Sequence, residues 1–120
     1  MAYKAVLIDD NKNTVLSLEY SLEWENLGIE LAGTAYDGRS GKELIEKTDP
    51  DIIISDVMMP RMNGFELCRE VKTNLDISHI PFVLLTAYHN SQNMYTGYKT
   101  GADAFFAETF RNRRFAGIDS

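Results

Sequence analysis

The chain has 120 residues, a length that predicts a single domain. Eighteen acidic residues against twelve basic ones give a net charge of −6, which argues against a domain that mainly grips nucleic acid phosphate. The single cysteine, Cys68, excludes an internal disulfide and a multi-cysteine metal site, and it indicates a reducing, cytoplasmic compartment. The opening residues, MAYKAVLIDD, predict neither a signal peptide nor a membrane span.

Short apolar runs alternate with longer segments of helical period along the whole chain. The runs predict strands over residues 6–8, 29–36, 51–56, 82–85 and 104–107. The periodic segments predict helices over residues 13–27, 40–47, 65–75 and 91–100. No repeat, low-complexity segment or linker interrupts this alternation.

Strands that alternate with helices predict an α/β fold with a parallel sheet covered by helices on both faces. The unbroken apolar run before Asp56 is typical of a strand buried on both sides. We therefore expect a flavodoxin-like, doubly wound sheet of five strands in the order 2-1-3-4-5. A final helix after residue 107 is doubtful, because residues 111–120 lack an amphipathic pattern.

Polar side chains stand where the first, third and fourth predicted strands end. Asp9 and Asp10 follow the first strand, Asp56 ends the third, and Thr86 ends the fourth. A single aspartate in such a place is usually a turn residue or a helix cap, but four suitable residues at neighbouring strand ends predict one shared site. Three carboxylates in one place repel each other, and a hard divalent cation such as Mg²⁺ relieves that repulsion.

The motifs LIDDN, SDVMMPRMNG, LLTA and GADAFF resemble the receiver domain of two-component response regulators, of the chemotaxis regulator type. The resemblance covers about residues 3–107, so we assign a receiver domain to residues 1–107 and an atypical tail to residues 108–120. It implies that Asp56 accepts a phosphoryl group from a histidine kinase or a phosphotransfer domain, with Mg²⁺ as cofactor. It further implies a switch without an external substrate, hence no enzyme, which signals to an output domain or protein that the sequence does not identify.

The same resemblance assigns roles to the residues around the phosphoacceptor. Asp9 and Asp10 would be the acidic pair that holds Mg²⁺, together with the phosphoacceptor itself and the backbone carbonyl of Met58. Thr86 would be the switch hydroxyl that turns toward the phosphoryl group. Phe105 would be the aromatic residue that moves inward with it.

The sequence departs from the family after the last predicted strand. Receivers normally carry Lys-Pro-Phe there, and the lysine contacts the phosphoryl group, whereas this chain has Glu108-Thr109-Phe110. A carboxylate beside an acidic site favours an alternative function, a phosphorylation-impaired interaction module that keeps the fold. A reading frame shifted by one base could restore Lys-Pro-Phe and an apolar helical pattern, so a frameshifted or engineered tail is a further hypothesis.

Without a final helix, apolar surface beside the fifth strand is uncovered, which predicts a marginal monomer or a homodimer.

Two further readings stay open. A Mg²⁺-dependent phosphohydrolase would need an additional acid or base and a substrate cap, for which the chain has no room.

The stretch LEWENLGIELAG resembles receivers fused to AraC-type DNA-binding domains, while VKTNLDISHIPFVLLTA resembles receivers in hybrid sensor kinases. The sequence does not choose between these outputs, and we expect no membrane contact from this domain.

Overall fold

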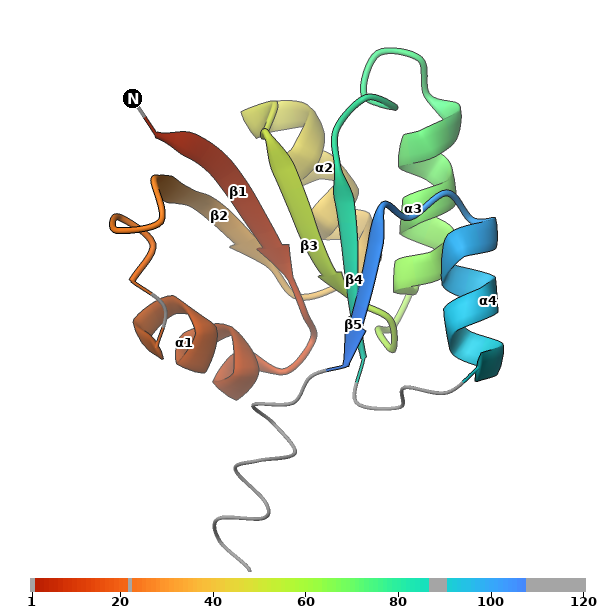
Figure 1. The fold of residues 1–120 in the computed structure, drawn as a ribbon, viewed down its shortest axis with the longest axis horizontal. Helices are drawn as coiled ribbons and strands as arrows, with labels where there is room; N and C mark the ends of the chain where they lie inside the picture. The colour runs from red at the N-terminus through yellow and green to blue at the C-terminus, as the bar shows by residue number, and fades with distance from the viewer. Residues whose placement is uncertain (1, 22, 87–90, 108–120) are drawn as a thin grey trace, which may run out of the picture.

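A computed structural model describes residues 2–21, 23–86 and 91–107 (Figure 1). Five strands alternate with four helices in this part of the chain. The strands are β1 (Tyr3–Ile8), β2 (Ile29–Ala35), β3 (Ile52–Asp56), β4 (Phe82–Thr86) and β5 (Ala104–Ala107). The helices are α1 (Lys12–Ser21), α2 (Gly38–Thr48), α3 (Gly64–Thr73) and α4 (Ser91–Lys99). No helix in the described ranges is both long enough and apolar enough to cross a membrane.

The five strands form one parallel sheet in the order β2-β1-β3-β4-β5, which confirms the predicted topology. The strand order reverses between β1 and β3. Because parallel strands leave their carboxyl ends at one edge, this reversal creates the crevice where ligands of such sheets usually bind. Residues 108–120, where a final helix is doubtful from the sequence, lie outside the described residues.

The main core fills one face of the sheet, under α2, α3 and α4 (Figure 1). The strand residues in it alternate along the chain, as a pleated strand requires: Val6, Ile8, Ile53, Phe82, Leu84 and Phe105. On the other face, α1 is the only helix among the described residues, and its Val15 is fully buried. On β3, β4 and β5, the larger apolar side chains of that face are half-buried or exposed, and they form what we term the open face: Ile52, Ile54, Val83, Leu85 and Phe106.

Local signals explain where two helices begin. Asp37 caps α2 by accepting a hydrogen bond from the backbone N–H of Ser40 at 2.8 Å. Asn63 and Glu66 form a reciprocal capping box at the start of α3, at 2.9 and 3.0 Å. Both helix starts therefore lie at the carboxyl edge of the sheet, on either side of β3.

Two predicted helix ends are wrong. The first helix does not run to residue 27: it ends at Ser21, and Trp24 begins a turn that leads to Gly28, which adopts a φ of 74°. Turn residues with hydrogen bonds three or four positions apart imitate helical spacing in the sequence, and Leu27 is 60% exposed. The third helix ends at Thr73, so Leu75 is 90% exposed rather than part of an apolar stripe.

A charged cluster closes the opposite, amino edge of the sheet. The Lys72 ammonium donates hydrogen bonds to the carbonyls of Ser78 at 3.1 Å and Ile80 at 2.8 Å, and it pairs with the Asp103 carboxylate at 2.8 Å. Asp103 also accepts a hydrogen bond from the backbone N–H of Phe82. Desolvation raises the pKa of Asp103, but the bonds from Lys72 and Phe82 outweigh it, and the pKa lies below its usual value. The cluster ties α3, β4 and the start of β5 together.

Candidate functional site

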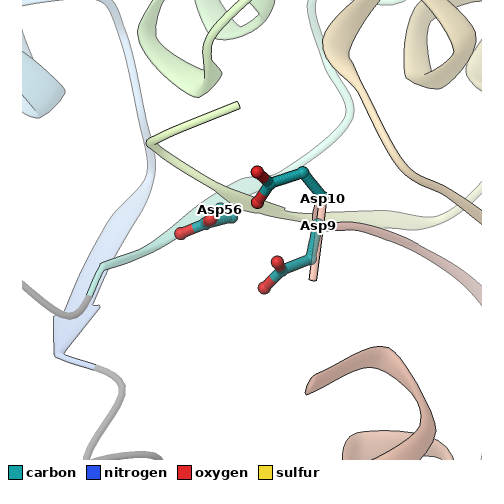
Figure 2. Close-up of side chains that lie close together, drawn as sticks. All are labelled: Asp9, Asp10 and Asp56. Carbon is teal, nitrogen blue, oxygen red and sulfur yellow. The ribbon is translucent and has the colours of Figure 1, made fainter. Parts of the chain in front are cut away.

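Three carboxylates meet at the carboxyl edge of the sheet. Asp9 and Asp10 follow β1 directly, Asp56 is the last residue of β3, and their oxygens lie within 4.8 Å of one another (Figure 2). Asp9 is 1% exposed and Asp56 is 5% exposed, whereas Asp10 is exposed. The structure thus brings together the three acidic residues that the strand ends predicted.

The pairing of β1 with β3 accounts for this arrangement. Ile8 pairs with Ser55, so the two strands end side by side and the next residues of each share one edge. Asp9 is fixed at both its backbone and its side chain, because its N–H bonds the Ala35 carbonyl and its Oδ1 accepts from the Asn11 N–H at 2.9 Å. The carboxylates are therefore set by the sheet rather than by a mobile loop.

The donor set fits Mg²⁺. Two like charges about 5 Å apart repel by roughly 3 kcal/mol at an effective dielectric constant of about 20, so two nearly buried carboxylates favour a cation between them. Mg²⁺ prefers oxygen ligands and usually takes one or two carboxylates while keeping several waters. The exposure of Asp10 leaves one side of the cluster open to solvent.

The two predicted switch residues lie on the neighbouring strands. Thr86 ends β4, next to β3, and is 1% exposed. Phe105 of β5 is 5% exposed, and its ring packs against Gly97 of α4 so closely that a Cβ there would lie 2.6 Å from the ring Cδ2. Tyr98 approaches the same ring, with 6.4 Å between the ring centroids. Both predicted switch side chains are thus buried, Thr86 at the edge that carries the acids and Phe105 against α4.

Two other predicted site residues have less structural support. Met58 lies in the turn after β3, with its side chain 63% exposed, and a role for its backbone carbonyl stays a prediction. Glu108 and the tail that follows it lie outside the described residues.

Sequence reasoning missed an ion pair next to the site. The Arg61 guanidinium, in the loop after β3, pairs with the Asp37 carboxylate at 2.9 Å. The pair Asp37-Gly38 predicts a turn, and the structure shows a helix cap whose other oxygen binds this arginine. The only signal for this ion pair in the sequence is an aspartate that can cap a helix with one oxygen and bind a cation with the other, together with an arginine in a short loop.

Known proteins resemble this chain in both sequence and structure. The family described as the response regulator receiver domain matches residues 5–117. The signal receiver domain of a signal transduction histidine kinase from Syntrophus aciditrophicus is 32% identical, with a TM-score of 0.77 over 89% of this chain and 79% of that one. The chemotaxis protein CheY4 of Vibrio cholerae is 28% identical, with a TM-score of 0.78 over 90% and 88% of the two chains. The receiver domain of Francisella response regulator 1452 is 27% identical, with a TM-score of 0.76 over 89% and 84%.

Proposed function

The chain belongs to the response regulator receiver family, and we propose that it is a phosphoacceptor switch of a two-component system, phosphorylated on Asp56. The observation that carries this proposal is the cluster of Asp9, Asp10 and Asp56 at the carboxyl edge of the sheet. The donor is a histidine kinase or a phosphotransfer domain in the cytoplasm, and the receiver signals to an output domain or protein. It turns over no external substrate and touches neither nucleic acid nor membrane.

The proposed reaction transfers one phosphoryl group. A carboxylate oxygen of Asp56 bonds to the phosphorus of a phosphohistidine while the P–N bond breaks, and the imidazole nitrogen keeps the electron pair of that bond. The product is an acyl phosphate on Asp56. Asp9, Asp10, Asp56 and the Met58 carbonyl would hold Mg²⁺, which would neutralise the negative charge of the phosphoryl oxygens.

Thr86 and Phe105 convert this charge into a change of shape in the proposed switch. The Thr86 hydroxyl turns toward the phosphoryl group as a hydrogen-bond donor, and the Phe105 ring, which is already buried against α4, shifts with it. The support is their position on β4 and β5, their burial, and the contact of Phe105 with Gly97, through which a moved ring also moves α4.

Labelling with acetyl phosphate and Mg²⁺ tests the phosphoacceptor. Intact-mass analysis should find one added, base-labile phosphoryl group on the parent chain and none on Asp56→Asn. Asp76→Asn is the matched control, because it removes the same charge from an exposed residue in the turn before β4. Unchanged labelling of Asp56→Asn contradicts the assignment of the phosphoacceptor.

One observation favours a second candidate function, an interaction module in which phosphorylation is impaired. Glu108 stands where receivers carry a lysine, and its carboxylate would repel a phosphoryl group instead of attracting it. Under this alternative the parent chain binds the phosphoryl mimic beryllofluoride more weakly than Glu108→Lys does. Equal affinities of the two proteins for beryllofluoride with Mg²⁺ contradict the alternative.

A further inference from the structure

The loop that leaves the phosphoacceptor, residues 57–63, is fastened to the start of α2. The Arg61 guanidinium pairs with the Asp37 carboxylate at 2.9 Å, and the Asp37 side chain is only 10% exposed. The backbones also touch, because a Cβ on Gly38 would overlap the carbonyl of Met62. The loop is therefore held on α2 by both a charge contact and a steric contact.

Arg61 occupies this position in an unfavourable backbone conformation. Its φ is 67°, in the left-handed region, which costs a residue with a Cβ about 1–2 kcal/mol and glycine nothing. Such outliers concentrate at functional sites, where the surrounding contacts maintain them. A glycine would fit the backbone better, so what the arginine contributes here is its side chain.

Asp37 serves α2 and the loop at the same time. One of its oxygens caps the helix by accepting from the Ser40 N–H at 2.8 Å, and the other accepts from Arg61. The pKa of Asp37 is lowered, first by the Ser40 N–H and then, against desolvation, by Arg61. The carboxylate is thus charged at neutral pH, and the ion pair is intact there.

Both ends of the loop are anchored beside the strand end that carries Asp56. Val57 donates its N–H to the Leu85 carbonyl at 3.1 Å, and Gly64 donates to the Val57 carbonyl at 2.8 Å. A side chain at Gly64 would overlap the carbonyl of Asp56, so α3 starts against the strand end itself. Between these anchors Met59 and Met62 pack partly against the core, and Arg61 and Met62 contact the start of α2.

We propose that Arg61 is a positioning residue: its ion pair with Asp37 fixes the loop after Asp56 and so preorganises the Mg²⁺ site, to which the Met58 carbonyl belongs. This inference rests on the proposed function. We assign the effect of the pair to the loop, because neither side chain belongs to the carboxylate cluster of Asp9, Asp10 and Asp56. Its loss leaves all three acids in place and removes the charged contact that holds this part of the loop on α2.

Two variants distinguish an effect of the ion pair on Mg²⁺ binding from an effect on the stability of the fold. Arg61→Gly removes the guanidinium and relieves the left-handed strain, while the greater freedom of glycine in the unfolded chain opposes that gain. Asp37→Asn removes the charge and keeps a good helix cap. We expect metal-free stability close to the parent in both, and Mg²⁺ affinity about three- to fivefold weaker.

The measurement is a titration of the isotope-labelled chain with MgCl₂, followed by NMR, beside urea unfolding without metal. The double variant should bind Mg²⁺ no more weakly than either single variant, because both remove the same interaction. Glu70→Gln is the matched control: it breaks the Lys42–Glu70 pair at 2.8 Å, which joins α2 to α3 without involving the loop.

The outcomes are distinct. Unchanged Mg²⁺ affinity in Arg61→Gly and Asp37→Asn overturns the positioning role and leaves the proposed function standing. An equal loss of affinity in Glu70→Gln overturns it as well, since a general effect of helix contacts would then explain the data. A parent chain that binds no Mg²⁺ overturns both the proposed function and this inference.

Discussion

Replacing Asp56 by asparagine removes a negative charge from a cluster that repels itself. The oxygens of the three acids lie within 4.8 Å of one another, and each pair repels by roughly 3 kcal/mol at an effective dielectric constant of about 20. Solvent around the exposed Asp10 and the hydrogen bond that the Asp9 carboxylate accepts from the Asn11 N–H offset much of this. We therefore expect Asp56→Asn to raise the metal-free free energy of unfolding by about 1–2 kcal/mol.

Mg²⁺ should offset that advantage. A ligand at ten times its dissociation constant stabilises the folded state by about 1.4 kcal/mol when it binds only that state. The parent chain gains this increment, whereas Asp56→Asn has lost a ligand and gains little. The two free energies of unfolding should therefore converge as MgCl₂ is added.

Urea unfolding with and without MgCl₂ measures both effects in one experiment. Asp76→Asn controls for the general benefit of lowering the net charge of −6, and it should change the metal-free value by no more than about 0.5 kcal/mol. The reasoning is refuted if Asp56→Asn is less stable than the parent without metal, or if Mg²⁺ stabilises both proteins equally.

Four further predictions concern the fold and its connection to the site. Lys72→Met should lower the free energy of unfolding, measured in urea, by about 2–4 kcal/mol, because it removes three charged hydrogen bonds of a side chain that is only 15% exposed. A loss below about 0.5 kcal/mol, which is typical of neutral surface substitutions, contradicts this prediction. The lowered pKa of Asp103 means that its contribution is complete above its unfolded pKa near 4 and is lost as pH falls through the folded value, so acid titration of the urea midpoint should be flatter in Lys72→Met. Gly64→Ala should weaken Mg²⁺ binding in an NMR titration, since its methyl group overlaps the carbonyl of Asp56, and normal affinity would show that α3 can move away freely. Sedimentation velocity should show self-association that Phe106→Ser reduces, whereas a stable monomer contradicts an uncovered open face.

The sheet and the acidic cluster could be predicted because they depend on local patterns. Each apolar run that stops at a polar residue marks a strand end, and parallel topology then brings those ends together. Asp9 and Asp56 are 47 positions apart in the sequence, yet both follow from the same rule. The predicted range of β5, residues 104–107, agrees with the structure for the same reason.

The contacts that fix the site depend on geometry that no local pattern encodes. The left-handed backbone of Arg61 decides whether its side chain reaches Asp37, and many residue types occur in such loops. The Lys72 cluster joins residues 72, 78, 80 and 103 through the path of a turn, and periodicity places this lysine only on the side of a helix. The end of α1 was missed because a turn imitated helical spacing.

Charges have opposite uses at the two edges of the sheet. At the amino edge Lys72 and Asp103 satisfy each other, so that cluster stabilises the fold without a ligand. At the carboxyl edge Asp9 and Asp56 are held close as like charges, an arrangement that costs stability until a cation binds. The strands between these edges are only four to seven residues long and span roughly 13–23 Å at about 3.3 Å per residue, still beyond the range at which substitutions usually couple. Changes at the amino edge should therefore move the free energy of unfolding and leave Mg²⁺ affinity alone, while Asp56→Asn should move both.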